Sequence, residues 1–213
     1  INVTRNLVDA LIKNGDSSVT LISASATGYY GYHGDEELTE TDPPGDDFLA
    51  GVCREWEAEA MKASGSVSRV VIPRFGVVLG SGGGAISVLG RIYRLRLGAR
   101  LGTGAQWFSW IARDDLASAI LFLLEKQSIS GPVNCTSPNP VTNRDLTRSL
   151  NRAMGTFPLV PPAPGFVLKA VLGEFGDFLL KGQRVKPGRL NREGFSFSLP
   201  GIDQALASIF VTA

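Results

Sequence analysis

Two serines near the start of the chain end an apolar run and could take part in chemistry. Residues 18–25 read SVTLISAS, a short β-branched stretch typical of a buried parallel strand, with Ser23 and Ser25 at its carboxyl end. Ligands of parallel sheets bind beyond the carboxyl ends of the strands, where a serine hydroxyl can hydrogen-bond a substrate oxygen. The alternative is that both serines only satisfy backbone groups at a strand end.

Metal or thiol chemistry has little support in the sequence. His33 is the single histidine, and Cys53 and Cys135 stand alone, so a cysteine–histidine zinc site is excluded. Seven carboxylates lie between Asp35 and Asp47 without EF-hand spacing, which indicates a solvated loop and no metal. Cys53 as a nucleophile would need an activating base, and nothing in the sequence ties His33 to it.

An α/β framework is predicted to hold these residues. Strand-like runs cover residues 18–25, 68–80 and 131–137, and helical patterns alternate with them, which favours a mainly parallel sheet. The expected helices are 1–14, 48–60, 86–97, 116–124 and 142–154. The residues that should cap or end them are Gly15, Asp46 or Asp47, Gly65 and Asp114.

Two of these helices show an apolar spacing that predicts which face is buried. In the first helix the predicted face is Val3, Leu7, Val8, Leu11 and Ile12. In the second helix it is Phe48, Leu49, Val52, Cys53, Trp56 and Ala60.

The pattern changes at about residue 155. A proline-rich segment is followed by an apolar helix over 166–182 and by alternating apolar residues at 195, 197 and 199. We therefore divide the chain into a sheet domain, 1–154, and a smaller lobe, 155–213.

Composition sets limits on partners and location. The chain of 213 residues is 44% hydrophobic and 19% charged with a net charge of +1, which predicts neither a nucleic-acid nor a membrane partner. No apolar run reaches the ~20 residues of a membrane helix. Two lone cysteines suit a reducing compartment, so a cytoplasmic location is expected.

Six stretches in register resemble the extended short-chain dehydrogenase/reductase superfamily, the group of NAD-dependent epimerases and dehydratases. Within it they resemble an atypical branch, nucleoside-diphosphate-sugar epimerase-like or cell-division-inhibitor-like. The stretches are SASATGYYG, DPPGDDFLAGVCREWEAEA, PRFGVVLGSGGGA, GTGAQWFSWIARDDLASAI, GPVNCTSPNPVTN and LLKGQRVKPGRL.

The resemblance implies a Rossmann-like doubly wound parallel sheet with a small C-terminal α+β substrate lobe. Members begin with a βαβ unit whose G-x-x-G-x-x-G turn holds the cofactor pyrophosphate. This sequence has no such turn, and GSGGG at 80–84 follows the wrong strand, so the first βαβ half is expected to be missing through N-terminal truncation.

The resemblance also implies NAD or NADP as the cofactor and assigns residues to its site. Ser25 matches the catalytic serine or threonine, and Arg74 matches an arginine beside the nicotinamide, the alternative being an arginine paired to a carboxylate. The implied cofactor-binding residues are Ser23, Ala24, Ser25, Arg74, Phe75, Val77 and Val78.

The resemblance also assigns residues to the substrate cleft. The implied substrate-binding residues are Arg94, Gln106, Trp107 and Trp110. The alternatives are an exposed helix face for Arg94 and its neighbouring arginines, and core positions for the tryptophans. Alanine stands at positions 105 and 112, where relatives commonly carry arginine and histidine.

The family's Tyr-x-x-x-Lys pair is absent. The tyrosine position falls on Phe48 or Leu49 and the lysine position on Val52 or Cys53, so no phenol is available in this helix. Tyr30 is the candidate substitute, with Tyr29 beside it, and the alternative is a ring packed under the acidic loop.

These features imply an NAD(P)-dependent nucleoside-diphosphate-sugar epimerase or oxidoreductase of the atypical extended type. The missing pair leaves open a second reading, a non-catalytic NAD(P)-binding regulatory protein. The implied partners are a small-molecule substrate such as a nucleotide sugar and a second copy of the chain, paired through the helices at 1–14 and 47–63.

Overall fold

The core of the fold is a parallel sheet centred on one long strand. The computed structural model describes residues 1–15, 17–172 and 180–210. Within them the sheet is built from β1 (Thr20–Ile22), β2 (Ser25–Ala26), β4 (Arg69–Phe75) and β8 (Gly131–Cys135). Val71 of β4 pairs with Ile22 on one side and with Gly131 on the other, so β4 is central. The predicted parallel α/β architecture is therefore confirmed.

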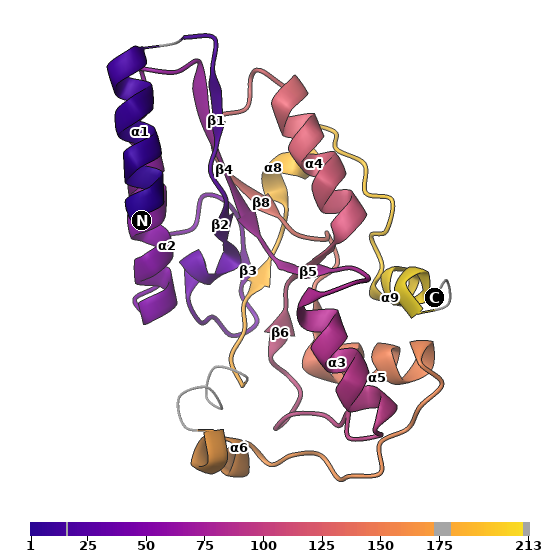
Figure 1. Cartoon of the computed structure of the whole chain (residues 1–213). Helices are drawn as coiled ribbons and strands as arrows, with labels where there is room; N and C mark the ends of the chain where they lie inside the picture. Colours follow the sequence, from indigo (N-terminus) through magenta and orange to yellow (C-terminus); the bar gives the residue numbers. More distant parts are fainter. Residues whose placement is uncertain (16, 173–179, 211–213) are drawn as a thin grey trace.

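Helices cover both faces of this sheet (Figure 1). On one face lie α1 (Asn2–Asn14) and α2 (Phe48–Met61), and on the other lie α4 (Arg113–Glu125) and α8 (Gly188–Arg192). Along β4, Val70 and Ile72 join the core under α1 and α2, whereas Val71 joins the core under α4. This alternation follows from the two-residue period of a strand that is buried on both faces.

The helix termini confirm part of the predicted capping. Gly15 ends α1 in the left-handed conformation at φ 58°, and Asp47 caps α2 by accepting from the Ala50 N–H at 2.9 Å. The prediction for Asp114 is wrong, because α4 begins at Arg113 with Ala112 at the cap position, and Asp114 lies inside the first turn. Gly65 lies beyond α2, which ends at Met61.

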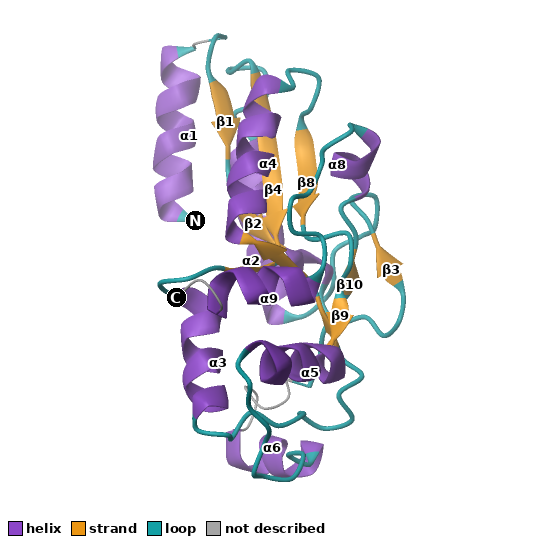
Figure 2. Ribbon diagram, turned by 90° about the vertical axis from the view of Figure 1, so that its right-hand side faces the viewer, coloured by secondary structure: helices purple, strands orange, loops and turns teal. Residues whose placement is uncertain are grey.

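The remaining elements form a second group beside the sheet (Figure 2). They are β5 (Val77–Leu79), α3 (Gly84–Arg94), β6 (Trp107–Phe108), β7 (Trp110–Ala112), β9 (Val141–Thr142), α5 (Asn143–Ala153), α6 (Gly165–Leu172) and α9 (Ile202–Phe210). One core includes Tyr93 of α3, Trp110 of β7, Leu150 of α5 and Leu206 of α9. This core draws on residues before and after 155, and the predicted division there stays a prediction.

The C-terminal third also packs beside the main sheet. Its short strand β10 (Arg184–Val185) pairs in parallel with β3 (Glu37–Leu38) as a separate two-stranded sheet. The alternating residues Phe195 and Phe197 form no strand; their rings pack edge to face at 4.8 Å between centroids, and Phe195 meets Phe122 of α4. The predicted apolar helix is present as α6, and its continuation through 173–179 lies outside the described residues. No helix in the described ranges is long and apolar enough to span a membrane.

Candidate functional site

A buried ion pair joins α2 to β4 at the carboxyl end of the sheet. Arg74, 2% exposed, donates from Nε to Oε1 of Glu57 at 2.8 Å and from Nη2 to Oε2 at 2.7 Å. Its guanidinium carbon lies 3.4 Å from the ring centroid of Tyr29. Two parallel hydrogen bonds and an aromatic cover suit the planar cation, so Arg74 is held inside the protein. Of the two readings of Arg74, carboxylate pairing is the one the structure shows.

Tyr30 belongs to the same network. Its hydroxyl accepts from Nη1 of Arg74 at 2.9 Å and donates to Oδ1 of Asn134 at 2.7 Å. Burial raises the pKa of Tyr30 to about 12, although the Arg74 charge acts in the opposite direction. The fully buried phenol therefore keeps its proton near neutral pH and donates it to Asn134. The catalytic role of Tyr30 stays a prediction, and the packing of its ring is what the structure shows.

Ser25 lies next to this network with its proton already committed. Its hydroxyl donates to Oε1 of Glu57 at 2.7 Å, and the residue is 7% exposed. Because the proton points to the carboxylate, the Ser25 oxygen is left as an acceptor for a substrate hydroxyl. The catalytic role of Ser25 stays a prediction, limited in this arrangement to orienting an alcohol.

The positions of the missing pair lie against the strand end. A Cβ built on Gly28 would lie 3.7 Å from Cβ of Leu49 and 3.8 Å from Sγ of Cys53, so the 3₁₀ turn η1 (Thr27–Tyr30) packs directly on α2. Phe48 is 83% exposed and points away. Burial raises the pKa of Cys53. The thiol therefore stays neutral and is not an activated nucleophile.

The predicted cofactor-binding residues fall into two groups. Ser25 pairs with Arg74 across β2 and β4, and Ser23 hydrogen-bonds the backbone of β4 just before them, so these residues do lie side by side. Ala24, next to Ser25, is exposed. The second group is Phe75, half-buried at the end of β4, with Val77 and Val78 on β5. Strand β5 pairs with β7 in a separate two-stranded sheet. Their contact with a cofactor stays a prediction.

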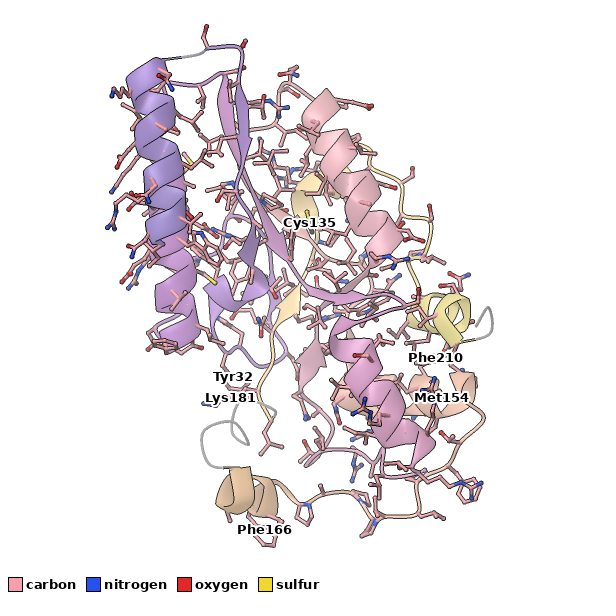
Figure 3. The ribbon with its side chains drawn as sticks, viewed as in Figure 1. Tyr32, Cys135, Met154, Phe166, Lys181 and Phe210 are labelled. Carbon is pink, nitrogen blue, oxygen red and sulfur yellow. The ribbon has the colours of Figure 1, made fainter. Side chains whose placement is uncertain are left out.

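A cavity of about 220 Å³ opens between the loop that follows η1 and the loop that leads into β6. The Trp107 indole N–H donates to Oδ1 of Asp35 at 2.8 Å and so links the two walls. The Arg184 guanidinium lies 4.5 Å from the Trp107 ring centroid and also binds Glu37. Tyr32, which lines the cavity, has Lys181 as a neighbour, with Nζ 5.9 Å from its ring centroid (Figure 3). The lining residues are Tyr32, His33, Gly34, Asp35, Thr103, Ala105, Gln106, Trp107 and Leu180.

The four predicted substrate residues separate in the structure. Gln106 and Trp107 line the cavity. Trp110 is fully buried and donates its indole N–H to the Asn139 carbonyl at 3.1 Å, so it is a core residue. Arg94 lies exposed on α3 and does not line the cavity. For Trp110 and Arg94 the alternatives, core packing and an exposed helix face, describe what is observed.

Sequence reasoning missed the partners that organise this region. Glu57 follows Cys53 by four residues and Ala50 by seven, a spacing that already places it on the buried side of α2. Asn134 is a polar residue inside an otherwise apolar strand end, and it also binds the Lys186 carbonyl. Within the described ranges, no three His, Cys, Asp or Glu side chains gather as metal ligands.

The likeness to known proteins covers most of the chain. Residues 1–135 match the NAD dependent epimerase/dehydratase family, and residues 163–209 match a domain of unknown function, DUF1731. The chain is 42% identical to the Epimerase family protein SDR39U1 homolog, chloroplastic, of Arabidopsis thaliana, over 98% of this chain and 60% of that protein. It is 36% identical to the Epimerase family protein YfhF of Bacillus subtilis, over 98% of this chain and 69% of that protein. The chain thus spans about 60% of the length of the first of these relatives.

Solved structures show the same similarity. Human epimerase family protein SDR39U1 (isoform 2), a structure with NADPH, superposes with a TM-score of 0.91 at 33% identity, over 100% of this chain and 72% of that chain. A nucleoside-diphosphate sugar epimerase from Corynebacterium glutamicum superposes with a TM-score of 0.77 at 36% identity, over 96% of this chain and 40% of that chain. Since the family match alone covers well over half of the residues, the chain belongs to the NAD-dependent epimerase/dehydratase family.

Proposed function

We propose that this chain supplies the substrate side of an NAD(P)-dependent oxidoreductase or epimerase. Its substrate class would be a nucleotide sugar or a similar alcohol or ketone. The support is the family membership, the NADPH in the human relative and the printed activity of the Corynebacterium relative. The observation that carries the proposal is the cavity at Trp107 and Gln106, which lies beyond the carboxyl end of β2, where open parallel sheets bind ligands.

The size and lining of the cavity limit what it accepts. At about 220 Å³ it is smaller than the roughly 300–1,000 Å³ of ordinary ligand pockets, so it would enclose one part of a nucleotide sugar. Its walls offer an aromatic face on Trp107, the Gln106 amide and the Thr103 hydroxyl, a set that suits a hydroxyl-rich ring.

The strand ends fit one end of a dinucleotide cofactor. Ala24 and Ala26 are exposed beside buried Ser25, and such small side chains leave room for a flat nicotinamide ring. The chain carries no glycine-rich turn for the pyrophosphate. The bound cofactor would accept or return hydride. Ser25 would accept a hydrogen bond from the substrate hydroxyl, held in place by Glu57 and Arg74.

The reaction should be slow, because the tyrosine–lysine pair that usually transfers the proton is replaced and the Tyr30 hydroxyl is occupied. Leu49 and Cys53 stand near the strand end at the positions of the missing pair, and Tyr30 is saturated by Arg74 and Asn134. General acid–base catalysis typically contributes 10²- to 10⁴-fold, so turnover is expected to fall short of that of members with the pair by roughly this factor.

The test measures cofactor binding and hydride exchange on the whole protein, and repeats the measurements on a variant in which a larger side chain fills the cavity. NADH and NADPH are titrated by tryptophan fluorescence, and isotopic hydride exchange is followed with a panel of nucleotide sugars. Ala105 is exposed and lines the cavity, so Ala105→Trp should weaken substrate binding about tenfold or more and leave cofactor binding intact. Ala207→Trp adds the same bulk on an exposed position of α9 and serves as the matched control.

The outcomes separate the parts of the proposal. Cofactor binding with no exchange for any nucleotide sugar would remove the catalytic claim and favour a nucleotide-sensing protein. Absence of cofactor binding would reject the proposal as a whole. Equal effects of Ala105→Trp and Ala207→Trp would show that the cavity is not the substrate site.

A further inference from the structure

The charges of this chain are unevenly distributed, although they sum to only +1. No Asp or Glu occurs between Glu59 and Asp114, a stretch of 54 residues. The same stretch holds eight cationic residues: Lys62, Arg69, Arg74, Arg91, Arg94, Arg96, Arg100 and Arg113. Arg69 and Arg74 are buried in the sheet, and Lys62 and Arg113 pair with Glu59 and Asp114. The other four cations lie on α3 and the loop that follows it, so the net charge hides a basic region there.

This basic region lies at the outer end of the second group of elements (Figure 1). The segment 155–164 runs alongside it, because the Leu159 N–H donates to the Arg96 carbonyl at 2.8 Å and the Ala163 N–H donates to the Arg100 carbonyl at 3.0 Å. The Arg96 guanidinium lies 4.6 Å from the ring centroid of Phe157. Two segments far apart in sequence thus form one continuous surface.

The same surface exposes large apolar side chains. Leu159 is 66% exposed, Leu95 64% and Val88 62%. Val88, Ile92 and Leu95 are spaced as one outer stripe of α3, with Arg91 within it and Arg94 at its border. Phe166 of α6, 76% exposed, lies farther along the same end (Figure 3). We call the following residues the outer patch: Val88, Arg91, Ile92, Arg94, Leu95, Arg96, Leu97, Phe157 and Leu159.

We propose that the outer patch binds the surface of an anionic lipid bilayer. Exposed aliphatic and aromatic side chains next to arginines, without carboxylates, are typical of elements that lie in the headgroup region. The apolar side chains enter the acyl boundary while the guanidinium groups bind lipid phosphates. The proposal does not depend on cofactor or substrate binding.

Charge complementarity favours a lipid bilayer over two other candidate occupants, a second copy of the chain and a nucleic acid. A second copy seated on the outer patch would bring arginines against arginines with no acidic residue in the patch to pair them. The carboxylates on the neighbouring helices, Asp145 and Asp203, are engaged with Arg148 and Arg152. A nucleic acid would use the arginines but would leave the exposed leucines and phenylalanine without a partner.

The test is sedimentation of the whole protein with lipid vesicles. Binding is expected to vesicles of phosphatidylcholine with phosphatidylglycerol, not to phosphatidylcholine alone, and should weaken as salt is added. Each cation near such a surface raises the partition coefficient about fivefold, so Arg91→Gln/Arg94→Gln should lower it roughly 25-fold. Lys126→Gln/Arg192→Gln, which removes the same charge from exposed positions at the ends of α4 and α8, should leave binding nearly unchanged.

A second pair of variants tests the apolar half of the patch. Leu95→Ser/Leu159→Ser should also reduce vesicle binding, whereas Leu121→Ser/Leu124→Ser, at positions of α4 that are 61% and 42% exposed, should not. All four changes lie at exposed sites, so the unfolding midpoint should be retained. Failure to sediment with anionic vesicles, or equal losses in patch and control variants, would overturn the proposal. A change in sedimentation coefficient for the patch variants without any vesicle binding would instead identify an interface between copies.

Discussion

The ion pair between Glu57 and Arg74 gives the sharpest prediction. Glu57→Gln keeps the size of the side chain but removes its charge and replaces one acceptor oxygen with an NH₂ donor. Oε1 accepts from Ser25 and from Nε of Arg74, and Oε2 accepts from Nη2, so the new donor meets at least one existing donor. Arg74, with a side chain only 3% exposed, keeps a buried charge without its counter-ion.

Removing one partner of a buried ion pair typically costs about 3–5 kcal/mol. For a chain of this size that corresponds to a fall of roughly 6–20 °C in Tm. The assay is equilibrium unfolding in urea followed by tryptophan fluorescence. Glu55→Gln is the matched control, since Glu55 is exposed two residues away on α2 and should change the free energy of unfolding by less than about 0.5 kcal/mol.

A double variant separates the pair from its surroundings. Glu57→Leu with Arg74→Met removes both charges and should destabilise less than Glu57→Gln alone, because no buried charge is left unpaired. Tyr30 would lose one donor in this variant and contribute a smaller loss. If Glu57→Gln loses less than about 1 kcal/mol, or if the two single changes simply add, the account of a desolvated and coupled pair is wrong.

Three further changes probe the surroundings of this pair. The raised pKa of Tyr30, about 12 against an ordinary 10.0, means that stability from this residue is present below pH 10 and is lost as the pH rises toward 12. Tyr30→Phe should remove up to about 2.7 kcal/mol of that alkaline loss, measured by urea unfolding at each pH. Gly45→Ala places a Cβ 2.6 Å from the Tyr30 carbonyl oxygen and should cost about 1–3 kcal/mol, whereas Gly34→Ala meets open space and should be neutral. Asp47→Ala removes the cap of α2 and should cost about 1 kcal/mol by the same assay.

The burial of α2 shows where local pattern was insufficient. The spacing of its large apolar residues predicted an inward face, yet Phe48 is 83% exposed and Trp56 39% exposed. The buried positions include Ala50, Cys53 and Glu57. Small residues let α2 approach the strand ends closely, and the glutamate is buried because an arginine from β4 meets it there. A hydrophobicity pattern registers neither a close approach nor a distant counter-ion.

The four predicted substrate-binding residues also separate into two groups. Gln106 and Trp107 line the cavity, and their role in substrate binding stays a prediction. The burial of Trp110 and the exposure of Arg94 depended on α5, α9 and the chain around Asn139, all distant in sequence. The apolar spacing of α1 was insufficient in the same way as that of α2, because Val8 is buried while Val3 on the predicted face is exposed.

The sequence by itself determined the alternation of strands and helices, the family, and the absence of the tyrosine–lysine pair. These features depend on local period, on end-capping residues such as Gly15 and Asp47, and on the identity of single residues. Only the tertiary structure decided that Arg74 is neutralised by Glu57, that the hydroxyls of Ser25 and Tyr30 are already engaged, and that a basic, apolar patch covers one end. Such properties arise from which distant side chains meet and how much water they exclude, and a linear pattern holds neither distance nor burial.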